Sequence, residues 1–281
     1  MLCARAGLWS PEQALGALAQ TAARYDVRPG SEWRPTIDTT RDPIIAARAP
    51  LPWSSWQRSE DYYSEGALIW LDVDTRLREM SGDTRSLDDF ARAFFGSNEG
   101  EWRVTDTYVF DDVMRALQEL APFDWTGFFT EQLEGKREGT QLDGIARGGY
   151  RLVYRDEPSA FTVSSDAVFG TTTLSFSIGL TVSSDGALKD VLWDGPAFDA
   201  GLTVGSELVA VNGRAYSADV LKQAITAGVS GEPIDLLVKT GKHVRPVAIT
   251  YDGGLRFPHL ERVDEGRARL DDIFAPLEGN R

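Results

Sequence analysis

The sequence is poor in the residues that build disulfides and metal sites. Its 281 residues include one cysteine, Cys3, and two histidines, so neither an intrachain disulfide nor a zinc-finger type site can be built. Basic residues are also few: 29 Lys and Arg stand against 43 Asp and Glu, which gives a net charge of -14. This balance argues against a phosphate-binding surface, and we expect no nucleic-acid partner.

Long apolar runs are missing too. No stretch approaches the roughly 20 residues that cross a bilayer, and residues 1–7 lack the basic and apolar regions of a signal peptide. A G-x-S-x-G nucleophile motif and a P-loop are likewise absent. We therefore expect a soluble chain with no membrane partner. With 42% hydrophobic residues, it can bury the core of one large or two ordinary domains.

The first half has the periodicity of helices. Ser10-Pro11-Glu12-Gln13 is a capping box that predicts a helix to about Tyr25. Residues 27–61 hold five prolines and three tryptophans, which indicates an ordered but irregular segment. Residues 64–80 form an amphipathic pattern, and shorter helices are expected from Ser86, over 111–121 and over 124–133. Adjacent acids do not face each other on a helix, so we expect solvated carboxylates at Asp72, Asp74, Asp88 and Asp89.

Beyond Gly148-Gly149 the pattern alternates with period two and becomes rich in β-branched residues, which predicts strands. One helix, over 218–227, interrupts them. The expected fold class is multidomain α + β, with a helical bundle followed by a small β-barrel or sandwich. The expected domains are a helical domain over 1–147, a connecting segment over 148–170, the β-domain over 171–252 and a tail over 253–281 that docks as a short helix.

A glycine-rich stretch gives the β-domain its most specific signal. Between Asp194 and Arg214 the sequence predicts a proline-started helix ended by Gly201, a strand, and an Asn212-Gly213 hairpin turn. This order resembles a bacterial PDZ domain, a module that binds an extended peptide end beside its second strand. The resemblance implies a carboxylate-binding loop with the amides of Ile178, Gly179 and Leu180. It leaves two alternatives for the groove wall: Val220 with Ala224, or Leu221 with Ile225. A spacer with an idle groove is equally compatible with the sequence.

Two tyrosines begin the helix predicted near residue 64. Adjacent tyrosines at a helix start usually serve packing. The pattern from Tyr63 to Gly66-Ala67, however, resembles the segment of zinc aminopeptidases in which a tyrosine hydroxyl hydrogen-bonds the oxyanion of the tetrahedral intermediate. A neutral phenol can do this at pH 7. The resemblance implies that Tyr63 is catalytic.

Taken together, the helical half and the PDZ-like half resemble the C-terminal portion of glycyl aminopeptidases, which are gluzincin-type metallopeptidases. Such enzymes hold zinc with H-E-x-x-H and a further glutamate. This chain has only His243 and His259, sixteen residues apart, and we expect solvated side chains at both. The resemblance therefore implies that zinc and an N-terminal catalytic segment are missing partners, that this chain binds no metal, and that it is inactive alone.

Two functions follow from these observations. The first is the C-terminal part of an aminopeptidase that removes N-terminal Gly or Ala from a peptide substrate. The second is a non-catalytic module in which a helical platform carries a PDZ domain that binds peptide C termini. A truncated enzyme should expose a large apolar face, whereas a native module should not. Any signal peptide would lie upstream, so the periplasm and the cytoplasm both stay open.

Overall fold

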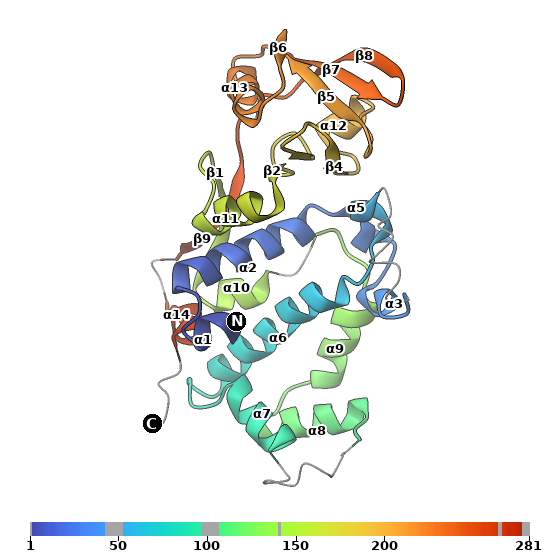
Figure 1. The fold of residues 1–281 in the computed structure, drawn as a ribbon. Helices are drawn as coiled ribbons and strands as arrows, with labels where there is room; N and C mark the ends of the chain where they lie inside the picture. Colours follow the sequence, from blue (N-terminus) through green and yellow to red (C-terminus); the bar gives the residue numbers. More distant parts are fainter. Residues whose placement is uncertain (1, 43–52, 97–106, 140–141, 264–265, 277–281) are drawn as a thin grey trace.

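The computed structural model describes residues 2–42, 53–96, 107–139, 142–263 and 266–276 (Figure 1). In its described part, the segment from residue 2 to 147 contains helices and no strand. These helices are α1 (Leu2–Arg5), α2 (Pro11–Asp26), η1 (Pro29–Glu32), α3 (Thr36–Thr39), α5 (Ser54–Gln57), α6 (Tyr62–Met80), α7 (Leu87–Phe95), α8 (Phe110–Leu120), α9 (Trp125–Glu134) and α10 (Asp143–Arg147). Part of the proline-rich segment, residues 43–52, lies outside the described residues. Among the described residues, no helix has the length and apolar character needed to span a membrane.

Helices α2 and α6 begin and end close to their predicted positions. Ser10 and Gln13 form the expected capping box at the start of α2. On α6, Ile69, Val73 and Leu77 are buried and form a hydrophobic cluster with side chains of α7, α8 and α9. α6 also packs against α10 and contacts α2, so it runs through the middle of the helical half (Figure 1).

The central position of α6 overturns one prediction. Asp72 and Asp74 are not solvated, because they are 4% and 2% exposed. Arg147 of α10 pairs with Asp72, and Asp74 Oδ1 accepts hydrogen bonds from Arg78 Nε at 3.1 Å and from the amide of Leu87 at 2.8 Å. Neighbouring elements cover this face of α6 and supply partners for Oδ1 of each carboxylate, while the buried Oδ2 of Asp72 has no hydrogen-bond partner among the described residues.

The remaining elements form a β-rich half, of which residues 171–249 lie above the helical half in Figure 1, whereas the C-terminal helix lies beside α1 and α2. They are β1 (Tyr150–Arg155), α11 (Ala160–Phe169), β2 (Thr171–Leu174), β3 (Leu180–Ser183), β4 (Leu188–Val191), α12 (Pro196–Asp199), β5 (Glu207–Val211), β6 (Arg214–Ala215), α13 (Ala218–Gly228), β7 (Ile234–Thr240), β8 (His243–Ile249), β9 (Phe257–Arg262) and α14 (Arg269–Phe274). Helix α11 and strand β9 were not expected from the sequence. The predicted docking helix near the C terminus is α14, whose Leu270, Ile273 and Phe274 are buried.

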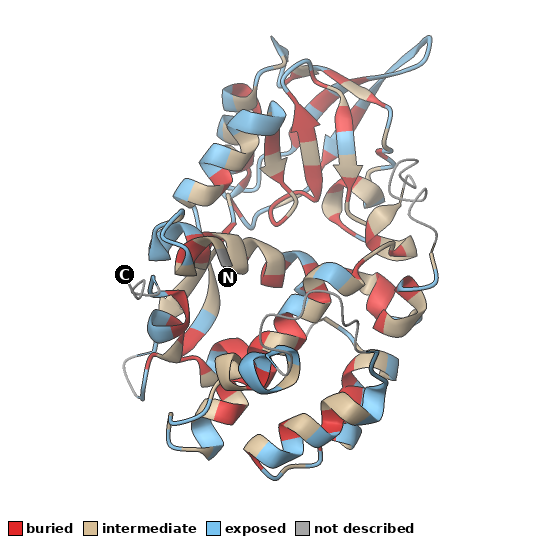
Figure 2. Ribbon diagram, turned by 60° about the horizontal axis from the view of Figure 1, so that its bottom comes forward, coloured by how far each residue is buried: buried red, intermediate tan, exposed pale blue. Residues whose placement is uncertain are grey.

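The strands form three separate antiparallel sheets. Their orders are β1-β9, β2-β3-β4 and β6-β5-β7-β8. Within the described residues no sheet closes on itself, so the expected barrel is not observed. β2, β3 and β4 share one hydrophobic core with β5, β7 and α13 (Figure 2). The Asn212-Gly213 turn has the predicted backbone, with φ of 46° and 73°.

An aromatic cluster joins the two halves. Trp56 of α5 stacks on Trp193, with ring centroids 5.2 Å apart, and Trp53 lies edge-on to both Trp193 and Phe198. The amide of Trp193 also donates to the hydroxyl of the buried Ser55 at 2.9 Å. The tryptophans of the irregular segment therefore pack against the β-rich half as well as on their own helices.

Candidate functional site

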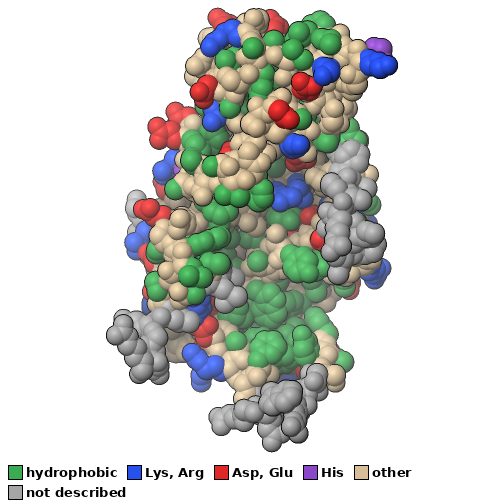
Figure 3. All heavy atoms as spheres, in the orientation of Figure 1, with side chains coloured by type: hydrophobic (Ala, Val, Ile, Leu, Met, Phe, Trp, Pro, Cys, Tyr) green, Lys and Arg blue, Asp and Glu red, His purple; other side chains and the backbone are tan. Residues whose placement is uncertain are grey.

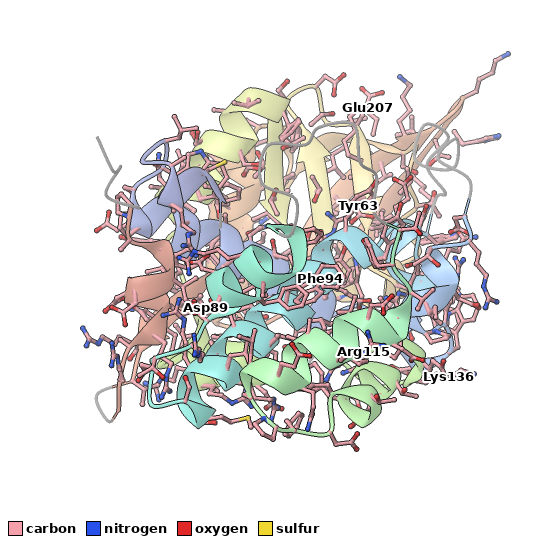
Figure 4. All side chains as sticks on the ribbon, turned by 90° about the horizontal axis from the view of Figure 1, so that it is seen from below. Tyr63, Asp89, Phe94, Arg115, Lys136 and Glu207 are labelled. Carbon is pink, nitrogen blue, oxygen red and sulfur yellow. The ribbon has the colours of Figure 1, made fainter. Side chains whose placement is uncertain are left out.

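The sequence-predicted tyrosine lies in the first turn of α6, at the surface (Figure 4). Tyr63 is 68% exposed, and its ring centroid lies 4.4 Å from that of Tyr62. The hydrogen bond between the two hydroxyls raises the pKa of Tyr62 to about 12. Because Tyr63 is exposed, a ligand that approaches from solvent can reach its phenol.

A buried ion network holds the start of α6 beneath these tyrosines. Asp61, the residue before the helix, is 3% exposed. Its carboxylate accepts hydrogen bonds from Arg58 Nε at 3.0 Å, Arg28 Nη1 at 3.2 Å and the Tyr25 hydroxyl at 3.3 Å. These partners come from α2, the turn after α2 and the end of α5. They fix the position of the backbone that carries Tyr62 and Tyr63.

Glu65 extends the network one turn along α6. Its Oε2 accepts a hydrogen bond from the Thr36 hydroxyl at 2.5 Å and pairs with Arg58. Arg58 itself has a φ of 55°, which a residue with a side chain seldom adopts. This backbone turn points the guanidinium inward, and the two carboxylates satisfy it there. The ion pairs offset both the strain and the desolvation of Arg58.

Sequence reasoning missed this network. The spacing of Asp61 and Glu65, four residues apart on one helix face, was the available signal. Their arginine partners lie up to 33 residues away in sequence, in an irregular segment, and no periodicity links them. A catalytic role for Tyr63 could therefore be hypothesised from the sequence, whereas the ion network that holds the start of α6 could not be predicted from it.

The residues proposed to bind a peptide carboxylate lie together but are closed in. Ile178 and Leu180 are fully buried in the core of the β-rich half. Gly179 has a φ of 78°, and its amide donates to the carbonyl of Leu174 at 3.2 Å, as does the amide of Ser177 at 3.1 Å. Two amides of the loop therefore already have acceptors within the chain.

The strand beside this loop has partners along both edges. β3 pairs with β2 over Thr171–Leu174 and with β4 over Leu188–Val191. A peptide that joins a sheet needs a free strand edge. Within the described residues β3 has none, so a peptide could add there only if β2 left the sheet.

The two alternatives for the groove wall differ in burial. On α13, Leu221 and Ile225 are fully buried, while Val220 and Ala224 are 8% and 5% exposed. All four belong to the same hydrophobic cluster. Of these two pairs, only Val220 with Ala224 retains some exposure to solvent.

The described residues do not fit a zinc site. No three His, Cys, Asp or Glu side chains come together there in the way that a metal ion requires. His243 is exposed on β8. His259 lies on β9, and its Nε2 is 2.8 Å from the carbonyl oxygen of Glu157, so this ring is not simply solvated as we had expected.

This chain is similar to known proteins in two respects, in part of its sequence and in its fold. The family model of M61 glycyl aminopeptidases matches residues 1–69, a region that includes Tyr63 and the ion network. An aminopeptidase N family protein from Idiomarina loihiensis has a similar structure, with a TM-score of 0.65 and 17% sequence identity. The match covers 98% of this chain and 46% of that protein, so the chain spans about half the length of its structural relative. No curated protein matches significantly.

Proposed function

We propose that this chain is part of a metallo-aminopeptidase that removes small N-terminal residues, glycine or alanine, from peptides, with Tyr63 as the oxyanion donor. The observation that carries this proposal is the exposed phenol of Tyr63 on a rigidly anchored helix start, inside the segment that matches the M61 family. The fold likeness to a solved aminopeptidase N family protein supports it.

The proposed role of Tyr63 requires a neutral donor at a fixed position. A phenol stays protonated at pH 7 and can donate one hydrogen bond to the oxyanion of a tetrahedral intermediate. Asp61 and Glu65 anchor the first turn of α6 through buried arginines. A donor held in this way needs little reorganisation when negative charge develops on the substrate.

Zinc, when bound, would polarise the scissile carbonyl and activate a water molecule. The described residues of this chain cannot hold it, so in this proposal another polypeptide segment supplies the metal site. The apolar surface of the helical half supports such a segment. Phe95, Tyr108 and Phe110 near the junction of α7 and α8 are 68%, 60% and 43% exposed, and Figure 3 shows hydrophobic side chains gathered over this half.

The test uses the protein translated from the complete reading frame and measures hydrolysis of glycyl and alanyl p-nitroanilides. Replacing Tyr63→Phe should lower kcat by about 10²-fold with little change in KM, the scale of one lost oxyanion donor. Tyr216→Phe is the control, because it also removes one phenolic hydroxyl, and that hydroxyl donates to the Ser183 carbonyl at 3.3 Å within the β-rich half, so kcat should be unchanged. An unaltered kcat in the Tyr63→Phe enzyme would remove Tyr63 from the active site.

The β-rich half supports a second, narrower proposal: residues 171–252 form a PDZ-like module. The order of β2 to β8 with α12 and α13, the positive φ of Gly179 and the Asn212-Gly213 turn favour it. Peptide capture at β3 would require β2 to detach. If the complete reading frame encodes no H-E-x-x-H motif, the aminopeptidase proposal fails and a non-catalytic binding module is the remaining function.

A further inference from the structure

A polar pocket lies where α2 faces the sheet β2-β3-β4. Its volume is about 250 Å³, and α2, the turn after it, α5 and the sheet all contribute to its lining. It is separate from the surface that carries Tyr63. Figure 3 shows basic side chains at this junction between the two halves.

Two side chains of opposite charge line the pocket without pairing to each other. Arg24 lies on the last turn of α2, and in the described part of the chain it forms no salt bridge. Asp190 lies on β4, and no cation described here is within salt-bridge distance of it. Among the residues that the structure describes, its Oδ1 accepts a hydrogen bond from the Ser54 hydroxyl alone, at 3.3 Å. A cation and an anion on different walls, neither of them in a salt bridge with another described residue, favour a ligand that carries both charges.

Arg28 adds a second cation at the same end of the pocket. Its side chain is 5% exposed, and Nη1 donates to Asp61 at 3.2 Å. Burial and, next, the charge of Arg24 lower the pKa of Arg28, while the charges of Asp61, Tyr25 and Asp190 oppose both effects. A ligand carboxylate between Arg24 and Arg28 would relieve the repulsion between the two guanidinium groups.

The rest of the lining suits the remainder of such a ligand. Thr181 and Ser175 present hydroxyl groups, which hydrogen-bond each other at 3.1 Å, and Phe176 and Leu192 present apolar surface. Ligand pockets commonly combine an apolar wall with a few polar groups that fix orientation. Here the polar groups would orient both ends of the ligand, and the apolar wall would take an aliphatic side chain.

We infer that this pocket binds a small zwitterion, an amino acid or a dipeptide, with its carboxylate at Arg24 and Arg28 and its ammonium group at Asp190. This inference does not depend on the proposed aminopeptidase activity, because Tyr63 and the metal take no part in it.

The experiment is calorimetric titration of this chain with L-leucine and with L-alanyl-L-leucine, each alongside its C-terminal amide and its N-acetyl derivative. At least one of the two zwitterions should bind, and its amide and N-acetyl forms should bind about tenfold more weakly or not at all. The comparison of L-leucine with the dipeptide identifies the length of the ligand.

Variants locate the site. Arg24→Gln should weaken binding by about tenfold or more, and it should leave the fold intact because Arg24 is exposed. Asp190→Asn should bind the zwitterion and its N-acetyl form equally. Arg115→Gln on α8, 66% exposed and far from the pocket in sequence, is the control and should bind like the unaltered chain.

Three results would overturn the inference. One is the absence of binding by either zwitterion up to about 10 mM, which corresponds to a negligible affinity. Another is an amide that binds as tightly as the free carboxylate. The third is an Arg24→Gln chain whose affinity is unchanged, which would place the bound molecule elsewhere on the protein.

Discussion

Replacing Asp61→Asn should destabilise the helical half strongly. Asp61 is 3% exposed and accepts hydrogen bonds from Arg58, Arg28 and Tyr25 at 3.0 to 3.3 Å. Asparagine keeps the shape but removes the charge. Arg58, 2% exposed, would keep Glu65 as its carboxylate partner, whereas Arg28, 4% exposed, would lose the carboxylate with which it pairs. Neutralising one member of a buried ion network costs about 3–5 kcal/mol.

Urea denaturation followed by tryptophan fluorescence and far-UV circular dichroism measures this loss. The matched control is Asp38→Asn. Its partner Arg41 lies at 3.2 Å, but the two side chains are 44% and 74% exposed, so the change should cost less than about 1 kcal/mol. If Asp61→Asn costs no more than this control, the buried network does not hold the start of α6 and does not fix the position of Tyr63.

Local signals in the sequence predicted most helices and strands of this chain. The Ser10 and Gln13 capping box and the Asn212-Gly213 turn each specify their structure through residues within a few positions of one another. Predictions based on such short-range chemistry were confirmed. β9 was missed because Phe257–Arg262 pairs with β1 about a hundred residues earlier, and nothing local marks that pairing.

Predictions about burial failed where several elements converge. Asp72 and Asp74 have the sequence pattern of a solvated helix face, yet α10 and the start of α7 cover them. Periodicity identifies an apolar stripe but not how many neighbours a helix has. The pocket at Arg24 and Asp190 could not be predicted from periodicity either, because the packing of the two halves brings those two residues together.

Two further predictions concern the contacts that hold the core together. Gly144→Ala should lower the free energy of unfolding by about 1–3 kcal/mol, because the new Cβ would lie 2.8 Å from the backbone of Asp72. Gly66→Ala should raise it by about 0.5–1 kcal/mol, because no heavy atom lies within 4 Å of the new Cβ. Urea denaturation measures both changes. A Gly144→Ala chain as stable as the original would contradict the close packing of α10 on α6. Tyr150 joins β1 to α14, and its hydroxyl donates to Asp271 at 2.5 Å. Burial and this hydrogen bond raise the pKa of Tyr150 to about 12. An unfolded tyrosine ionises near pH 10, so above that pH the unfolded chain loses its proton first. The stability from this group is therefore complete below about pH 10 and is lost as pH rises toward 12. The Tyr150→Phe chain should lose less stability over that interval than the original chain, and an equal loss in the two would show that Tyr150 ionises alike in the folded and unfolded states.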